Sequence, residues 1–170
     1  SGQNLRVSGL TTVVGNAQLD ASGQLSLADG TIITGTLSER ADTITHQGSL
    51  LVGQDLSARA GQGFTQIGTL DVGGNTQVRS GTTLSLNSAA QIGGSAQLSS
   101  AGSLQSRSTL DVGKDLNLHT DTGDLQLDGS VLANGRIDAR AGGLLQLKAP
   151  VASGRDITLA IAAMISGELK

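Results

Sequence analysis

The chain contains the stretch Thr69-Leu70-Asp71-Val72-Gly73, and almost the same stretch returns as Thr109-Leu110-Asp111-Val112-Gly113. Ser49-Leu50-Leu51-Val52-Gly53 is a relative of both. A second block follows the glycine and occurs as Gly53-Gln54-Asp55-Leu56, Gly113-Lys114-Asp115-Leu116 and Gly154-Arg155-Asp156-Ile157. Internal repetition of this kind decides the fold of a whole chain.

The repeats can be aligned on equivalent corner residues, and this gives a period of about 20 residues, typical of solenoids. The anchors are Asn16, Thr34, Gly53, Gly73, Gly93, Gly113, Asn134 and Gly154. After each anchor, two mostly apolar positions flank a polar one, as Leu116 and Leu118 flank Asn117. This in-out-in alternation is the period of a β-strand and not of a helix.

Two further short strands complete each repeat. One follows a glycine corner, as in Leu125-Gln126-Leu127, and the other leads into the next anchor, as in Leu70-Asp71-Val72. Three strands and three corners in about 20 residues leave no room for crossover helices, so each strand must pair in parallel with its counterpart one repeat later. We attribute the corner glycines to positive φ, which glycine adopts at little cost.

The sequence therefore predicts an all-β fold, a right-handed parallel β-helix of about eight triangular coils with a rise of ~4.8 Å per coil. Interior side chains should stack in columns, and one such column comprises Leu56, Thr76, Ala96, Leu116 and Ile137. We expect residues 1–170 to form a single β-helical repeat segment, a fragment of a longer rod.

The composition suits many small, similar layers. Gly occurs 25 times, Phe and Pro once each, and Cys, Trp and Tyr are absent. Hydrophobic residues make up 37% of the chain, which is too much for a disordered segment. The net charge of −3 gives no field that favours nucleic acid. No apolar run approaches the ~20 residues of a transmembrane segment.

The motif (V/I)-G-x-D-L-x-(L/A), followed by Gly and L-x-L, resembles the shaft of filamentous haemagglutinins. It is equally similar to the stalks of contact-dependent growth inhibition effectors, and both families are exoproteins of two-partner secretion. The resemblance extends from about Gly2 to Leu159. It implies export through a dedicated outer-membrane transporter and a secreted location at the bacterial cell surface. The partner there would be a host-cell or neighbouring-cell receptor or a sulfated glycan.

This resemblance predicts a non-catalytic structural and adhesive rod segment of a haemagglutinin-like adhesin. The alternative is the stalk of a contact-dependent growth inhibition protein whose toxic domain lies outside this segment. The residues themselves indicate no catalytic site, no cofactor and no metal site. His46 and His119 are far apart, no spacing supports a nucleophilic triad, and each histidine is expected to be a solvated strand or loop residue.

A carbohydrate-active β-helix enzyme is disfavoured because such enzymes need clustered carboxylates, usually beside aromatic sugar platforms. Here Trp and Tyr are absent and the Asp residues are dispersed. The nearest cluster is Asp121, Asp124 and Asp128, in the longest coil. A polar corner explains it better than a calcium site, because Asp favours turns.

Two features carry functional hypotheses. The first is an outward-facing column that comprises Arg40, Arg59, Arg79, Ser99, His119 and Arg140. It is either a track that binds polyanionic glycan or a solvated row of charges that deters edge association.

The second is the irregular coil 36–46, in which Glu39 occupies a position that is apolar in the other coils. An unpaired buried carboxylate would cost several kcal/mol, so we expect the strand to break or bulge at Glu39. The coil is then either a binding loop or simple sequence drift.

Overall fold

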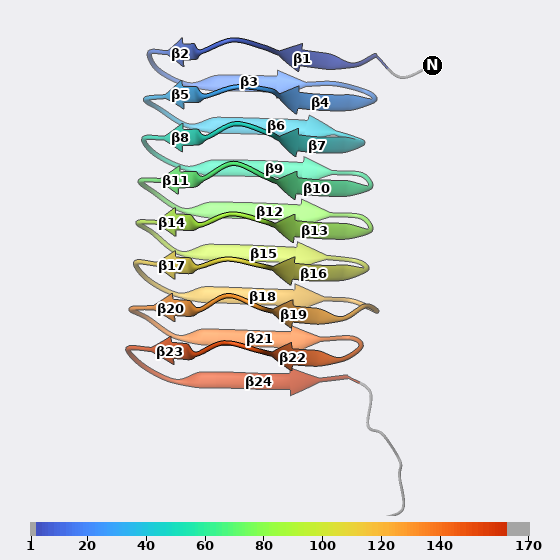
Figure 1. Ribbon diagram of the computed structural model, residues 1–170, viewed down its shortest axis with the longest axis vertical. Helices are drawn as coiled ribbons and strands as arrows, with labels where there is room; N and C mark the ends of the chain where they lie inside the picture. The colour runs from blue at the N-terminus through green and yellow to red at the C-terminus, as the bar shows by residue number, and fades with distance from the viewer. Residues whose placement is uncertain (1–2, 163–170) are drawn as a thin grey trace, which may run out of the picture.

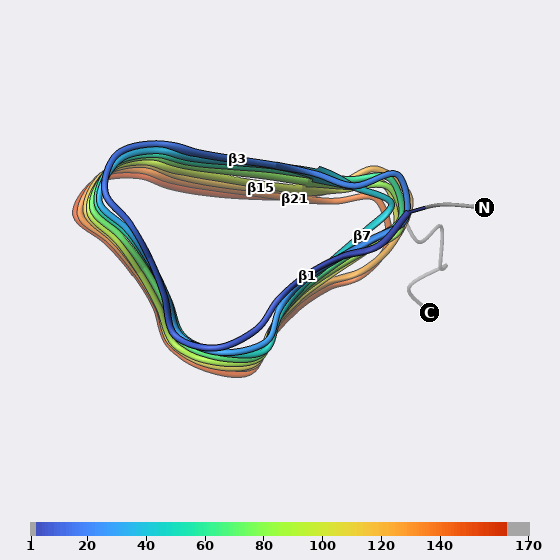
Figure 2. The ribbon, with the colours of Figure 1, turned by 90° about the horizontal axis from the view of Figure 1, so that it is seen from above.

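The computed structural model describes residues 3–162, and these form a rod of stacked coils built from strands, with no helix. Figure 1 shows the coils one below another, and Figure 2 shows their triangular outline. Seen from the N-terminal end, the chain runs clockwise from β1 through β2 to β3 as it recedes, so the solenoid is right-handed. The predicted fold is confirmed.

Each side of the triangle is one 8-stranded parallel sheet. Sheet A contains β1 (Leu5–Val7), β4 (Gln24–Leu27), β7 (Thr43–His46), β10 (Gly63–Gln66), β13 (Thr83–Leu86), β16 (Ser103–Ser106), β19 (Leu125–Leu127) and β22 (Leu145–Leu147). Sheet B contains β2 (Thr11–Val13), β5 (Thr31–Ile33), β8 (Leu50–Val52), β11 (Leu70–Val72), β14 (Ala90–Ile92), β17 (Leu110–Val112), β20 (Val131–Ala133) and β23 (Val151–Ser153). Sheet C contains β3 (Ala17–Asp20), β6 (Leu37–Ala41), β9 (Leu56–Ala60), β12 (Thr76–Ser80), β15 (Ala96–Ser100), β18 (Leu116–Thr120), β21 (Ile137–Ala141) and β24 (Ile157–Ile161).

Equivalent residues of successive coils pair directly, which confirms the predicted interior column of Leu56, Thr76, Ala96, Leu116 and Ile137. All five are buried. The lumen is filled by aliphatic side chains and by Phe64, which is 0% exposed. Successive residues of a strand point to opposite faces, so the polar residue between two buried ones faces solvent.

The predicted alignment is wrong only in the first coil. Ala17, and not Leu19, pairs with Leu37, while Leu19 pairs with Glu39. Asn16 is therefore not equivalent to the anchor Thr34. The shift is by an even number of residues, so inward-facing side chains stay inward.

The Asp or Asn in the repeated G-x-D-L block caps the next coil. The carboxylate oxygen Oδ1 of Asp55 accepts a hydrogen bond from the backbone N–H of Asn75 at 2.6 Å, and Oδ1 of Asn75 accepts one from Ser95 at 3.0 Å. Oδ1 of Asp115 does the same for Arg136 at 2.8 Å. These corners lie between strands, so the side chain supplies a bond that no ladder provides there.

Among the described glycines only Gly9 and Gly15 have a positive φ, so the prediction that corner glycines adopt positive φ is wrong for the others. Close stacking accounts for others. A Cβ built on Gly93, for example, would collide with the carbonyl oxygen of Gly73 in the preceding coil. At such a corner the absence of a side chain lets neighbouring backbones approach.

Candidate functional site

The predicted basic column lies on the outer face of sheet C in the predicted register. Arg40 pairs with Arg59, and Arg59 pairs with Arg79. The column continues through Ser99, His119 and Arg140. Asp20 precedes Arg40 in the same column.

The first three arginines form the strongly basic part of this column. Arg40, Arg59 and Arg79 are exposed, and within residues 3–162 none of them forms an ion pair. They line a shallow groove of about 400 Å³ whose other walls are small residues such as Gly61 and Gly81. Three consecutive coils thus each present an arginine that forms no ion pair among the described residues, beside open space.

His119 and Arg140, the other ionisable members of the column, each lie beside an acid on their own strand or corner. Nε2 of His119 lies 2.9 Å from Asp121, and the side chain of His119 is 44% exposed, which confirms His119 as a solvated strand residue. Arg140 donates to Oδ2 of Asp138 at 2.9 Å. The column is therefore less basic toward the C-terminal end of the rod.

Glu39 faces the lumen, and the predicted break in its strand does not occur. Strand β6 runs unbroken through it, and Glu39 keeps its register with Leu19 and Ala58. The residue is 2% exposed. Its burial is tolerated because both carboxylate oxygens lie 3.0 Å from Nε2 of His46.

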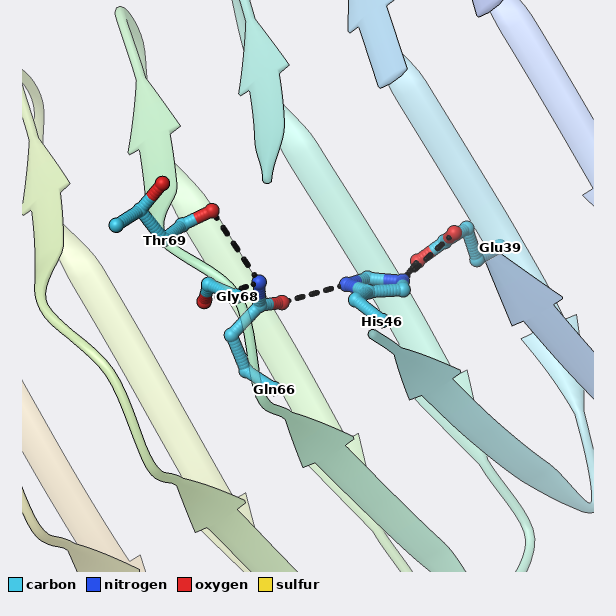
Figure 3. A network of polar contacts seen from close by, with 5 residues as sticks. All are labelled: Glu39, His46, Gln66, Gly68 and Thr69. Carbon is cyan, nitrogen blue, oxygen red and sulfur yellow. Dashed lines mark hydrogen bonds and ion pairs between the residues drawn. The ribbon is translucent and has the colours of Figure 1, made fainter. Parts of the chain in front are cut away.

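His46 is also inside the lumen, so the prediction that it is solvated is wrong. It is 0% exposed and packs edge-on against the ring of Phe64, with the ring centroids 5.2 Å apart. Its Nδ1 lies 2.6 Å from Oε1 of Gln66, whose Nε2 donates to the carbonyl oxygen of Gly68 at 2.9 Å. We call Glu39, His46 and Gln66 the lumenal triad; Figure 3 shows it as one continuous row across neighbouring coils.

The directions of the hydrogen bonds determine where one proton of the triad lies. The amide nitrogen of Gln66 donates to Gly68 and Thr69, so its oxygen faces His46 and must accept from a protonated Nδ1. Burial lowers the pKa of His46, but the charge and hydrogen bond of Glu39, with the bond to Gln66, outweigh it and raise this pKa above its ordinary value. The contact with Glu39 therefore favours the imidazolium form of His46 more than water does.

The alternation in the sequence contains the signal for this triad. His46 and Gln66 fall on the same inward column as Leu27 and Leu86. With Glu39 they are polar residues at inward positions of neighbouring coils, and such residues indicate mutual partners.

A polar groove of about 500 Å³ also runs along sheet C. Its outward row comprises Ser57, Gln77, Gln97, Asn117 and Asp138. Within this row Nε2 of Gln77 donates to Oε1 of Gln97 at 3.0 Å. The residues between the buried ones are thus polar and outward, as the alternation predicts.

The acids of the longest coil serve structural roles. Asp124 accepts from the backbone N–H of Leu144 at 2.8 Å, and Asp121 pairs with His119. The hydrogen bond from Gln126 and then the contact with Lys148 lower the pKa of Asp128 below its ordinary value. In the part of the chain that the structure describes, no group of three or more His, Cys, Asp or Glu side chains could hold a metal ion.

No protein-family model matches this chain, and no curated protein or solved structure matches it. Among residues 3–162 no helix is long and apolar enough to cross a membrane. The β-solenoid fold fits a rod-like structural repeat protein.

Proposed function

We propose that this segment is a non-catalytic structural and adhesive rod of a secreted bacterial surface exoprotein, and that its basic column binds a polyanionic glycan. The observation that carries the binding is the stack of Arg40, Arg59 and Arg79 on consecutive coils, exposed and without ion-pair partners among the described residues.

The spacing of these arginines suits an extended anionic chain. Successive coils of a parallel solenoid lie ~4.8 Å apart, so the guanidiniums form a linear array along the rod. A guanidinium binds sulfate or phosphate groups through paired, charge-assisted hydrogen bonds. The small residues Ala60, Gly61 and Gly81 beside the array leave room for a chain to lie against it.

The structural part of the proposal follows from the fold. Each coil of a solenoid is held by its neighbours, and about eight coils give a rod roughly 40 Å long. The closest pair of an acid and a base in the lumen, Glu39 and His46, has side chains that are 0% exposed, where no substrate reaches them. This pair supports a structural role rather than a catalytic one.

The export part of the proposal rests on the resemblance of the repeats to two-partner-secretion shafts. On that basis the partner during export is an outer-membrane transporter. At the surface, the partner is a receptor or sulfated glycan of a host or neighbouring cell.

The binding proposal is tested with a heparin-like chain. Replacing Arg59 and Arg79 by Gln should weaken binding about tenfold or more, because hydrogen bonds to charged groups contribute over ~1 kcal/mol each. Binding by the parent should fall steeply with salt, since exposed charges are screened over ~8 Å at physiological ionic strength. Titration calorimetry at several salt concentrations measures both effects.

The matched control is the double variant Lys114→Gln with Arg155→Gln. It removes two positive charges from exposed corner residues outside the column. Lys148 is less suitable because it pairs with Asp128 at 3.0 Å. Equal losses of affinity in the two double variants would mean that binding depends on overall positive charge and not on the column. If the parent does not bind, the binding proposal fails and only the structural role of the rod remains.

A further inference from the structure

The lumenal triad joins two consecutive coils through charged and polar groups, in a lumen that is otherwise mostly aliphatic. Glu39 lies on β6 and His46 on β7 of one coil, and Gln66 lies on β10 of the next. We propose that the triad is a pH-sensitive lock, which holds these two coils together and specifies their pairing while one proton is shared between His46 and Glu39.

The lock depends on a fixed number of protons. One proton sits on Nδ1 of His46 and is donated to Gln66; a second lies between Nε2 and the Glu39 carboxylate. If the second proton is lost, a ring nitrogen lone pair faces a carboxylate at 3.0 Å in a dry lumen. Two buried acceptors then face each other without a donor, which is costly.

Glu39 is the charged partner of His46. Leu27 on β4 and Gln66 on β10 flank His46 in its sheet, and Phe64 on β10 packs against its ring. Ala58 on β9 is the neighbour of Glu39. None of these four residues titrates. The other strongly buried acid among the described residues, Asp138, pairs with Arg140 on the outer face. The pH response therefore belongs to the His46–Glu39 pair.

The direction of the response follows from the raised pKa of folded His46. In the opened chain the pKa returns to about 6.5. The stabilisation is therefore complete below about pH 6.5 and is lost as pH rises through the pKa of folded His46. Over that interval the junction between the two coils should open more often as pH increases.

The same contacts specify which coil follows which. The apolar columns are nearly interchangeable, so a coil could be extruded as a loop and its neighbours could still pair. If the coil that contains β10 were extruded, His46 would face Leu86 instead of Gln66. A single buried polar pair is known to fix the register of otherwise degenerate apolar interfaces.

Hydrogen exchange of the whole chain, followed by mass spectrometry from pH 5.5 to 9, tests the pH response. Protection factors, corrected for intrinsic exchange, should fall in β7 and β10 by up to about tenfold per pH unit above about pH 6.5 and then level off. Strands β16 and β19, which are distant from the triad, should show no such fall.

Glu39→Gln is the matched variant. Without the carboxylate charge, the burial that lowers the pKa of His46 is opposed mainly by the hydrogen bond to Gln66, a smaller influence than burial. The alkaline fall should therefore vanish, and protection should decrease on acidification instead. An alkaline fall that persists in Glu39→Gln, or is absent from the parent, overturns the pH part of the proposal.

A second variant tests the pairing and does not depend on how Glu39→Gln folds. Glu39→Ala, His46→Leu and Gln66→Leu together install residues that the same columns already carry. The chain has no Cys, so disulfides report pairing cleanly. Thr45→Cys with Thr65→Cys reports the native pairing, and Thr45→Cys with Ser85→Cys reports an extruded coil.

In the parent background only the native cysteine pair should cross-link. In the triple variant the second pair should also cross-link, and exchange should lose its dependence on pH between 6 and 9. If the triple variant forms only the native disulfide, the triad does not specify the pairing and that part of the proposal fails.

Discussion

A buried hydroxyl in this lumen is tolerated where a carbonyl oxygen accepts a hydrogen bond from it. Ser80 and Thr120 donate to the carbonyl oxygens of Thr83 and Gly123 at 2.6 Å each. Thr76 differs, because it is 1% exposed and its Oγ1 has no hydrogen-bond partner. An unsatisfied buried hydroxyl costs ~1–3 kcal/mol.

Replacing Thr76 by Val should therefore stabilise the protein by about 1 kcal/mol, because Val keeps the shape and removes the hydroxyl. Urea unfolding measures this as a higher midpoint with an unchanged slope. Ser80→Ala is the control: it removes a satisfied hydroxyl and should not stabilise. A loss of stability in Thr76→Val would mean that the hydroxyl is bonded in solution.

The lumenal triad cannot be predicted from its residues taken one at a time. Taken alone, Glu39 in an apolar column implies a broken strand, and His46 alone implies a solvated side chain. Each conclusion follows from the cost of burying one polar group. The burial of Glu39 on sheet C is offset by its contact with His46 on sheet A. The two side chains come together only when the coil closes into a triangle.

Columns of equivalent residues stabilise the strands of sheet C. Leu116 lies on β18 and is 1% exposed, with Ala96 and Ile137 as its neighbours in the adjacent coils. Neither neighbour can hydrogen-bond a charged side chain. The column is therefore sensitive to a charged group at Leu116.

Leu116→Asp should abolish cooperative thermal unfolding, because an unpaired buried carboxylate is among the few changes that cost more than ~4 kcal/mol. Circular dichroism against temperature measures this. Gln97→Glu, at an exposed outward position whose row neighbours Gln77 and Asn117 are neutral, should leave the transition nearly unchanged. Similar melting of Leu116→Asp and the parent would mean that the faces of the strand are exchanged.

Most elements could be predicted because alternation and repetition agree in nearly every coil. They disagree in the first coil. There Asn16 accepts the backbone N–H of Thr36 at 2.9 Å, as Asp55 does for Asn75. Asn16 is thus a capping residue, and its side chain is easily confused with the Asn that replaces glycine at the Asn134 anchor.

The whole molecule is a stack in which each coil pairs with its neighbours, and its energetics are close to one-dimensional. The fold could be predicted for that reason, since one repeat determines the next. The charge of the basic column was harder to predict. Its positions were correct, but the pairing of Arg140 with Asp138 depends on which side chains meet on the surface.

This architecture makes a definite prediction about removing a coil. Deleting residues 74–93 removes one complete coil and joins Gly73 directly to Gly94. Gly94 is the equivalent of Gly74 one coil later, so it takes the place of Gly74. Every column keeps its register, so the shortened chain should fold and melt cooperatively. Its rod should be shorter by ~4.8 Å, as measured by small-angle X-ray scattering.

The matched control is deletion of residues 74–83, which removes half a coil. The strand that follows would then occupy the wrong side of the triangle, and its inward column would no longer meet its neighbours. This chain should lose the single cooperative transition, because the coils before the deletion and those after it keep their own registers but are mismatched where the two groups meet. If both deletions unfold, coils cooperate over more than nearest neighbours; if both fold, the columns do not specify the stack.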